Sequence, residues 1–250
     1  MRVDIVTLFP DYFSGPFACG PTRVAQEKSG LSIVLTNPRD FTHDPHRTVD
    51  DYPFGGGPGM VLKPEPVFSA VESVRTPASW VVLLSPQGRQ FTQPVAEELS
   101  RKQHLVLICG RYKAVDERVR AGLCQDELSA GDFVLSGGEA AACCVVEAIA
   151  RLLPGAVGDE ESVATDSFSN GMLDAPYYTR PAEFRGMKVP EVLLSGDHAA
   201  VARWRRREAL ARTMRRRPEL LAGQVLDQEE RNYLMHEIEK EFSNGKEERS

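Results

Sequence analysis

The chain has 250 residues and a mass of 27.7 kDa; 42% of its residues are hydrophobic, 26% are charged, and the net charge is −6. This composition is typical of a soluble globular protein, and it excludes a disordered chain, a coiled-coil rod and a collagen-like repeat. No stretch approaches the roughly 18 consecutive apolar residues of a membrane span, and the first residues lack a signal-peptide pattern. We expect a cytoplasmic protein with one large domain, or one domain with a small appendage.

The first half of the chain alternates strand-like and helix-like patterns. Continuous apolar runs suit strands that are buried on both faces of a parallel sheet, and they predict strands at 3–8, 80–84, 105–109 and 132–135. Helical patterns follow the second and fourth of these runs, at 92–102 and 139–153. This order of elements predicts an α/β domain with a largely parallel sheet.

The second half has a different character. Residues 158–170 are acidic, small and polar, which predicts a mobile linker. Beyond a proline-rich stretch, Asp197 is placed to cap a helix, and a last helix is predicted at 227–242. In the helix after Asp197, helical spacing puts one set of apolar side chains on a shared face: Val201, Trp204, Ala211 and Met214.

Arginines are concentrated between residues 203 and 217. This segment holds eight arginines and one acid, Glu208, a balance of +7 that leaves −13 for the rest of the chain. Such asymmetry predicts a polyanion-binding segment on an acidic body, because guanidinium groups match phosphate geometry. The alternative interpretation is a solvated helix face. Helical spacing places Arg205, Arg212 and Arg216 on one side of this helix.

Cysteines and histidines give little sign of a metal or a disulfide framework. The five cysteines are an odd number without a Cys-x-x-Cys pair, and we expect most of them to be buried as small hydrophobic side chains. His43 and His46 flank Pro45, which argues against a shared helical face. We therefore predict no stable metal site.

Three strand ends carry loops suited to a ligand, at 84–89, 109–112 and 135–139. Ligand sites in parallel α/β sheets lie at the carboxyl ends of strands, and glycines let backbone N–H groups approach a ligand closely. The loops therefore predict a shared pocket. The usual P-loop and dinucleotide fingerprints are absent, so the likeness of 135–139 to the signature of ATP-binding-cassette proteins has no support. The glycine-rich segment 54–60 is either a surface turn or the wall of a cleft.

The sequence pattern leaves the roles of two charged residues undecided. Asp166 is a loop carboxylate within the predicted linker, and Arg151 lies near the end of the helix at 139–153. An arginine there is also explained by the favourable field at a helix C-terminus. Spacing alone does not connect the two.

Nine motifs occur in one order along the chain: PRDFTHD at 38–44, HRTVDD at 46–51, GGGPGM at 55–60, LSPQGR at 84–89, CGRY at 109–112, LSGGE at 135–139, DSF at 166–168, YTRP at 178–181 and VLLSG at 192–196. Each motif is weak alone, but the ordered set is highly specific. Over about residues 1–235 the chain resembles the bacterial tRNA (guanine-N1-)-methyltransferases of the TrmD type.

The resemblance implies a SPOUT-class fold, a largely parallel sheet with a deep trefoil knot, plus a small helical C-terminal domain, in a homodimer. It implies methylation of guanine N1 at tRNA position 37, 3′ of the anticodon, with S-adenosyl-L-methionine as donor, which maintains the reading frame. On this basis residues 1–157 form the knotted donor-binding catalytic domain, 158–170 a flexible linker and 171–245 the tRNA-binding domain. Magnesium assists the family's reaction, and no dedicated metal ligands are expected here.

The resemblance also assigns residues to roles. Asp166 matches the general base and Arg151 its partner arginine, at a site shared across the dimer interface. Asp50, Pro58 and Gly59 match residues near the target base, and Arg203, Arg205, Arg212 and Arg216 would grip the RNA backbone. The donor would be held by the loops of the knot, at Leu84, Ser85, Pro86, Gly110, Ala130, Gly131, Asp132, Phe133, Val134, Leu135 and Gly137.

The chain departs from the family pattern in the second of these loops. The family commonly has RYEGIDER where this chain has RYKAVDER at 111–118, so Lys113 reverses a charge and Ala114 replaces a glycine. Phe133 stands where a tyrosine is common. We expect activity to survive with an altered donor affinity or rate. The alternatives are a SPOUT enzyme that modifies another RNA position and an RNA-binding protein that has lost activity through Lys113.

Overall fold

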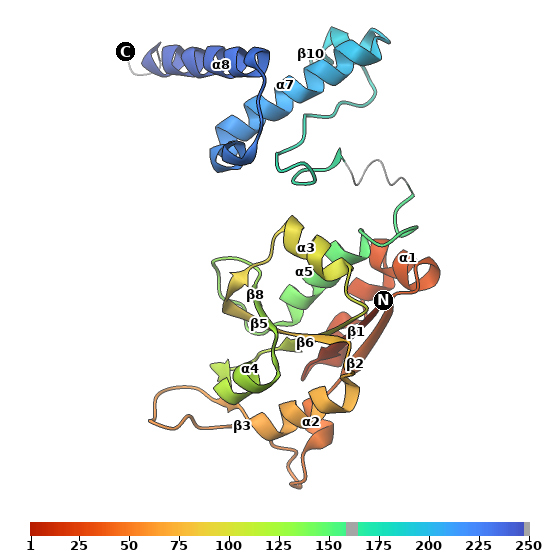
Figure 1. The fold of residues 1–250 in the computed structure, drawn as a ribbon, viewed down its shortest axis with the longest axis vertical. Coiled ribbons are helices and arrows are strands. Elements are labelled where there is room, and N and C mark those ends of the chain that lie inside the picture. The colour runs from red at the N-terminus through yellow and green to blue at the C-terminus, as the bar shows by residue number, and fades with distance from the viewer. Residues whose placement is uncertain (159–164, 248–250) are drawn as a thin grey trace. The chain divides into compact units, whose positions relative to one another are not determined.

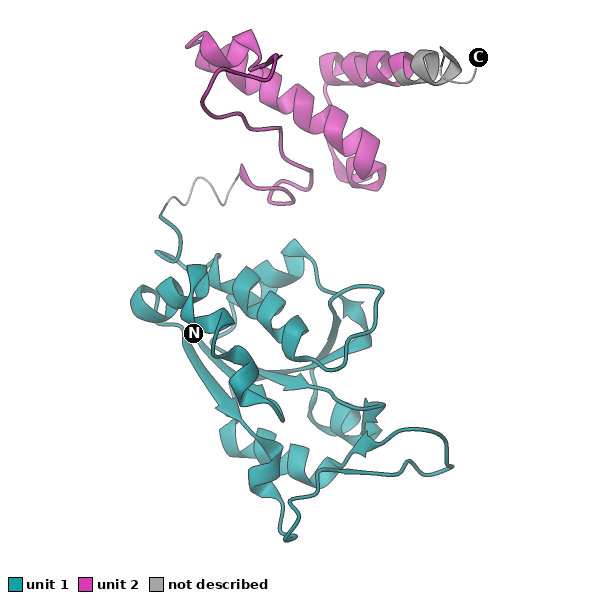
Figure 2. Ribbon diagram, turned by 180° about the vertical axis from the view of Figure 1, so that it is seen from behind, with its two compact units in different colours: residues 1–160 teal, residues 161–250 magenta. Residues whose placement is uncertain are grey.

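The computed structural model describes residues 1–158 and 165–247. Contacts divide the chain into two compact units, 1–160 and 161–250, coloured separately in Figure 2. The boundary falls inside the segment predicted as a linker, of which residues 159–164 lie outside the described residues. Among the described helices, none combines the length and the apolar character needed to span a membrane.

Unit 1 is built on a five-stranded sheet in the order β2-β1-β6-β5-β8, and every neighbouring pair in it is parallel. The central strands β1 and β6 are almost wholly buried. This confirms the α/β class with a mostly parallel sheet. The strands are β1 (Arg2–Val6), β2 (Ser32–Thr36), β5 (Ser79–Gln90), β6 (His104–Cys109) and β8 (Asp126–Ser129).

Helices cover both faces of the sheet (Figure 1). One face packs α1 (Gly20–Lys28), α3 (Gln93–Ser100) and α5 (Glu139–Ala150) over side chains such as Val3 and Leu105. The other packs α2 (Pro64–Val74) and α4 (Glu117–Leu123) in a second apolar cluster. Alternate residues of each strand supply the two clusters, because successive side chains of a strand point to opposite faces. Within residues 1–158 the unit also contains 3₁₀ helices at Pro10–Phe13, Pro16–Ala18 and Pro38–Phe41.

A second, small sheet lies beside the main one in unit 1. It contains β3 (Asp50–Asp51), β4 (Val61–Leu62) and β7 (Ala114–Val115). β3 pairs antiparallel with β4, and β4 pairs parallel with β7. It therefore ties the glycine-rich segment 54–60 to the loop that follows β6.

The strand prediction is wrong at one place and incomplete at another. The predicted strand at 132–135 is an exposed loop, and the strand of this region, β8, comes earlier. The apolar run at 133–135 misled because its side chains border a cavity rather than a core. β2 was missed: it is an edge strand with Val34 and Leu35 partly exposed. The predicted helices at 92–102 and 139–153 are confirmed as α3 and α5.

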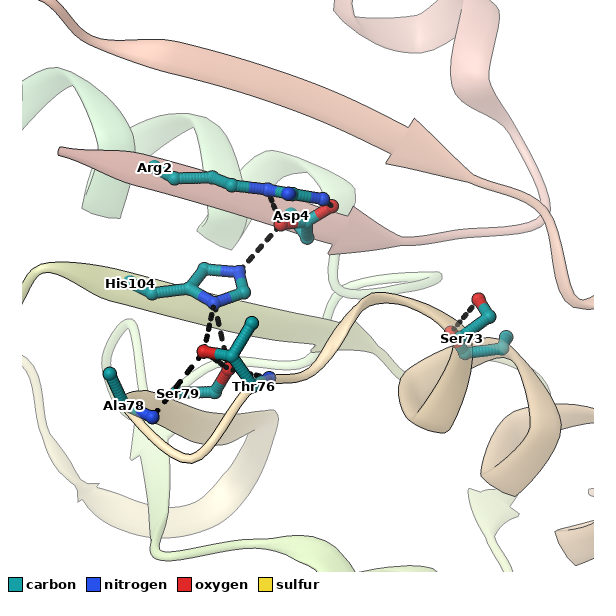
Figure 3. A network of polar contacts seen from close by, with 8 residues as sticks. Arg2, Asp4, Ser73, Thr76, Ala78, Ser79 and His104 are labelled. Atoms are coloured by element: carbon teal, nitrogen blue, oxygen red, sulfur yellow. Dashed lines mark hydrogen bonds and ion pairs between the residues drawn. The ribbon is translucent and has the colours of Figure 1, made fainter.

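A buried polar network joins the amino-terminal ends of β1, β6 and β5 (Figure 3). His104, only 5% exposed, places Nε2 2.6 Å from Asp4 Oδ2 and Nδ1 2.7 Å from Ser79 Oγ. Asp4 also accepts hydrogen bonds from Arg2 at 2.6 and 2.9 Å. The order Asp–His–Ser resembles a hydrolase triad, but ligand sites of such sheets lie at the opposite, carboxyl ends of the strands. We interpret the network as structural.

Over residues 165–247, the elements of unit 2 that the structure describes include a short hairpin and two long helices. They include β9 (Glu183–Phe184), β10 (Met187–Lys188), α7 (His198–Arg216), α8 (Gln228–Glu247) and the 3₁₀ helices Glu191–Leu194 and Pro218–Gly223. The predicted cap is confirmed, because Asp197 accepts a hydrogen bond from the Ala200 N–H at 3.0 Å. The buried face of α7 centres on Leu210 with Ala209, Ala211 and Thr213. The buried face therefore differs from the predicted apolar face, of whose members only Ala211 is fully buried.

Candidate active site

A cavity of about 230 Å³ opens where the three glycine-containing loops meet in unit 1. β5 loses its register with β8 between Leu84 and Arg89, and within this irregular stretch Ser85, Pro86 and Gln87 line the cavity. The loop after β6 and the loop after β8 form the rest of the wall. The shared pocket predicted at the carboxyl ends of the strands is present.

Glycines allow two of these loops to touch backbone to backbone. The Gly138 N–H donates to the Gly110 carbonyl at 2.9 Å, and a Cβ on Gly138 would lie 2.7 Å from Cys109 Cα. A Cβ on Gly88 would lie 2.3 Å from the Glu127 carbonyl carbon. Neither site has room for a side chain, so the loops can reach these positions only as glycine.

A buried ion pair locks two loops together behind the cavity. Glu139 is 1% exposed, accepts a hydrogen bond from the Thr7 hydroxyl at 2.8 Å, and lies 3.4 Å from Arg111. Arg111 also donates to the Ser136 carbonyl at 3.2 Å and covers the ring of Phe9 at 4.3 Å. A carboxylate this deeply buried needs such partners. The sequence offered CGRY and LSGGE as motifs but gave no sign that Arg111 and Glu139 meet.

The predicted donor-binding residues come together at this cavity. Of that set, all of it within the described chain, Asp132 alone lies outside the cavity wall. Phe133, Val134 and Leu135 expose apolar side chains there, with Val134 88% exposed. The ten that line the wall are Leu84, Ser85, Pro86, Gly110, Ala130, Gly131, Phe133, Val134, Leu135 and Gly137.

This wall fits a flat heteroaromatic ligand with a polar tail. Apolar side chains offer faces to a ring, and close-packed glycine backbone leaves its peptide groups near the ligand. Arg111 Nε is buried without a hydrogen-bond partner among the described residues, and its side chain lines the cavity. The fit therefore supports a molecule of the chemical type of S-adenosyl-L-methionine.

Of the residues predicted near the target base, Asp50 lies on the small sheet, and Pro58 and Gly59 lie in the loop that joins β3 to β4. Asp50 begins β3, and the Lys113 N–H donates to the Met60 carbonyl at 2.9 Å, next to Pro58 and Gly59. A Cβ on Gly59 would lie 3.2 Å from Lys113 Cβ. Lys113 lines the cavity, is exposed, and forms no ion pair with a side chain that the structure describes.

The two predicted catalytic residues belong to different units. Arg151 is half-buried at the C-terminal cap of α5, where its N–H donates to the Glu147 carbonyl at 3.2 Å. Asp166 is half-buried in unit 2. No contact within either unit joins Arg151 to Asp166, because each residue belongs to a different unit.

Asp166 sits in a hydrogen-bonded turn. Its carbonyl accepts from the Ser169 N–H at 3.2 Å, and the Phe168 N–H donates to the Met172 carbonyl at 2.6 Å. The Ser167 hydroxyl oxygen accepts from the Asp174 N–H at 3.0 Å. Arg217, at the end of α7, covers the Phe168 ring at 5.9 Å. Within unit 2, this turn therefore contacts the arginine-rich segment.

The arginines of α7 separate into two groups. Arg206 pairs with Glu230 at 2.6 Å, Arg207 with Glu229, Arg215 with Glu237 and Arg217 with Glu219, so carboxylates neutralise half of the cluster. The other four form no ion pair within the described part of the chain: Arg203, Arg205, Arg212 and Arg216. These are the arginines predicted to contact RNA.

The cysteines do not behave as predicted. Cys109 is buried, but Cys19 and Cys144 are exposed, so the expectation that most are buried is wrong. Cys144 lies on the outer side of α5, whereas Val145 and Val146 lie in the core. Burial raises the pKa of Cys143 to about 11 and that of Cys124 to about 12, which keeps both thiols protonated near neutral pH.

Within residues 1–158 and 165–247, no group of three His, Cys, Asp or Glu side chains is arranged to hold a metal.

Known proteins resemble this chain over nearly its whole length. Residues 1–223 match the family described as tRNA (Guanine-1)-methyltransferase TrmD. Proteins named tRNA (guanine-N(1)-)-methyltransferase are 54% identical in Dictyoglomus turgidum, over 97% of this chain and 98% of the relative, and 52% identical in Geobacillus kaustophilus, over 96% and 99%. A third, from Dehalococcoides mccartyi, is 52% identical over 94% and 96%. The chain belongs to the TrmD family of tRNA (guanine-1)-methyltransferases.

Proposed function

We propose that this enzyme transfers a methyl group from S-adenosyl-L-methionine to N1 of the guanine at tRNA position 37, 3′ of the anticodon, and so maintains the reading frame. Membership of the family gives the reaction class, methylation of guanine N1 in tRNA. The observation that carries the donor assignment is the cavity at the carboxyl ends of the strands, lined by ten residues that sequence reasoning assigned to the donor.

When bound, S-adenosyl-L-methionine supplies a methyl group on a positively charged sulfur. Leu84, Phe133 and Leu135 offer apolar surface to its adenine ring, and the peptide groups around Gly110 and Gly137 offer donors and acceptors. A wall of this kind binds a nucleoside without phosphates, which accounts for the absence of a P-loop.

Asp166 is the proposed general base. Guanine N1 carries a proton and is a poor nucleophile, so a carboxylate must remove that proton as the nitrogen lone pair attacks the methyl group. Negative charge then develops on O6 of the guanine, and the guanidinium of Arg151 stabilises it. The target base must leave its stack to reach the cavity, beside Asp50, Pro58 and Gly59.

The quaternary arrangement follows from the same assignment. We propose a homodimer in which Arg151 of one subunit and Asp166 of its partner serve one site, a deep trefoil knot formed by the cavity loops, and a tRNA-binding helical domain over 171–245. The fact that Arg151 and Asp166 belong to different compact units is compatible with a shared site. Magnesium belongs to this proposal as an aid to the reaction without a dedicated protein site.

Transfer of a labelled methyl group to two tRNA transcripts, with guanine or adenine at position 37, tests the proposal. Wild type should label only the guanine transcript, and Asp166→Ala should lower the rate roughly 10²- to 10⁴-fold while donor affinity in calorimetry stays within twofold. Label on both transcripts would move the target elsewhere on the RNA. Tight tRNA binding without any label, or without heat from the donor, would favour the non-catalytic RNA-binding protein.

A further inference from the structure

Unit 2 carries a second cavity that the proposed reaction does not use. It has a volume of about 350 Å³ and lies between residues 176–182, the 3₁₀ helix Glu191–Leu194 and α7. Leu193 and Val201 supply an apolar floor, and Tyr177, Tyr178, Arg180 and Arg205 supply aromatic rings and positive charge. We call this cavity the tyrosine groove.

Tyr177 presents an aromatic ring that is held in place. Tyr177 is 61% exposed, the Arg205 guanidinium lies 5.4 Å from its ring centre, and the neighbouring Asp174 carboxylate raises the pKa of its hydroxyl. Tyr178 is 50% exposed and packs at 6.3 Å against Trp204. Large aromatic surfaces are normally buried, so two exposed and anchored rings in one hollow indicate a stacking platform.

The charge around the tyrosine groove identifies the kind of ligand. Its described lining contains two arginines and no acidic residue, and neither Arg180 nor Arg205 forms an ion pair with a described side chain. Arg212 and Arg216, also without carboxylate partners, continue the face of Arg205 for roughly 16 Å along α7. Aromatic rings next to a line of cations are how proteins hold single-stranded nucleic acid.

We propose that the tyrosine groove holds one unpaired base of the substrate tRNA, stacked on Tyr177, while Arg205, Arg212 and Arg216 follow the neighbouring phosphates. The base is a loop nucleotide other than the target guanine, because the target must enter the donor cavity of unit 1. The inference rests on the proposed function and adds a second base contact to it. A peptide or a second copy of this chain explains the cationic lining less well.

Binding of a tRNA transcript, with 2-aminopurine placed in turn at the unpaired anticodon-loop positions other than 37, tests this inference. Tyr177→Leu keeps apolar volume but removes the ring, and should weaken tRNA binding roughly 5- to 100-fold and abolish quenching of the 2-aminopurine that stacks. Tyr177→Phe keeps the ring and should bind within about threefold of wild type, which a role for the hydroxyl alone would not predict.

The matched control is Phe184→Leu, which removes an exposed ring covered by Arg185 at 5.1 Å, outside the tyrosine groove. It should leave tRNA binding unchanged. Equal weakening by Tyr177→Leu and Phe184→Leu would overturn the proposal, and so would wild-type binding by Tyr177→Leu. A change of molar mass in light scattering with tRNA affinity retained would make the groove a subunit contact instead.

Two further measurements keep the outcomes separate. Calorimetry with S-adenosyl-L-methionine should give wild-type affinity for each variant, and Arg205→Gln replaces Tyr177→Leu as the test if the latter does not fold. Methyl transfer by wild type to the guanine-37 transcript is measured in the same samples. If wild type transfers label but Tyr177→Leu changes neither tRNA affinity nor 2-aminopurine quenching, only this inference fails. If quenching occurs without methyl transfer, the proposed function fails.

Discussion

Lys113 is a positive charge in the wall of a cavity that should receive a positively charged sulfonium. It forms no ion pair with a described side chain, and its charge opposes that of the sulfonium. We predict that Lys113→Glu tightens donor binding roughly 3- to 10-fold in calorimetry, about 1 kcal/mol for a charge pair near the surface. The effect should shrink at high salt.

The control for Lys113 is Arg118→Gln. Arg118 is exposed on α4, pairs with Asp116 at 2.8 Å and lies outside the cavity wall. It should leave donor affinity unchanged. If Lys113→Glu weakened donor binding instead, the lysine would be contacting the donor carboxylate, and the charge argument would be wrong.

The His104 network stabilises the amino-terminal edge of the sheet and takes no part in the proposed methyl transfer. Replacement by Leu leaves a buried Asp4 oxygen and the Ser79 hydroxyl without this partner. We predict that His104→Leu lowers the free energy of unfolding by about 1–3 kcal/mol in urea titrations, with Ser79→Ala lowering it less. Donor affinity should not change. Altered donor affinity with unchanged stability would refute the structural interpretation.

At the scale of elements, α7 shows that neighbouring arginines have different electrostatic roles. α8 neutralises Arg207 and Arg215, whereas Arg212 and Arg216 keep their charge. We predict that Arg212→Gln and Arg216→Gln each reduce the slope of log K for tRNA binding against log salt by about 0.7–0.9. Arg207→Gln, whose charge is already paired, is the control and should change the slope little. Equal slopes for all variants would contradict the division into two groups.

Much of the architecture was predictable because local patterns and final environment agree. Continuous apolar runs at 80–84 and 105–109 are buried strands, and Asp197 caps α7 as its position suggested. The strand predicted at 132–135 was wrong because the apolar run at 133–135 lines a cavity, and such a run has the same composition as a buried strand. β2 was missed because an edge strand is only half buried, so its hydrophobic pattern is weak.

The candidate site was predictable only for the residues that belong to the family's sequence motifs. The family resemblance placed ten residues in the cavity wall, but the Arg111–Glu139 pair joins residues from two loops that no spacing connects. The arginine pairing is likewise invisible in sequence, because it depends on α8 lying along α7. Long-range contacts of this kind are set by the fold and not by local propensity.

At the scale of the whole molecule, the proposed shared site makes a prediction about mixed dimers. Arg151→Ala and Asp166→Ala should each be inactive alone. Mixed and allowed to exchange subunits, half of the dimers carry both variants, and one of their two sites has both intact residues, so activity should recover to about a quarter of wild type. No recovery, despite exchange verified by differently tagged subunits, would place both residues of each site in one chain.

The most direct test of the account locates the methyl group on the RNA. A guanine-37 transcript treated with the enzyme and S-adenosyl-L-methionine is digested to nucleosides for mass spectrometry, and a second portion is copied by reverse transcriptase. We predict 1-methylguanosine as the product and a stop one nucleotide before position 37, because a methyl group on N1 blocks base pairing. Both signals should vanish with Asp166→Ala. A stop at another position, or a methylated ribose in the digest, would contradict methylation of N1 at position 37.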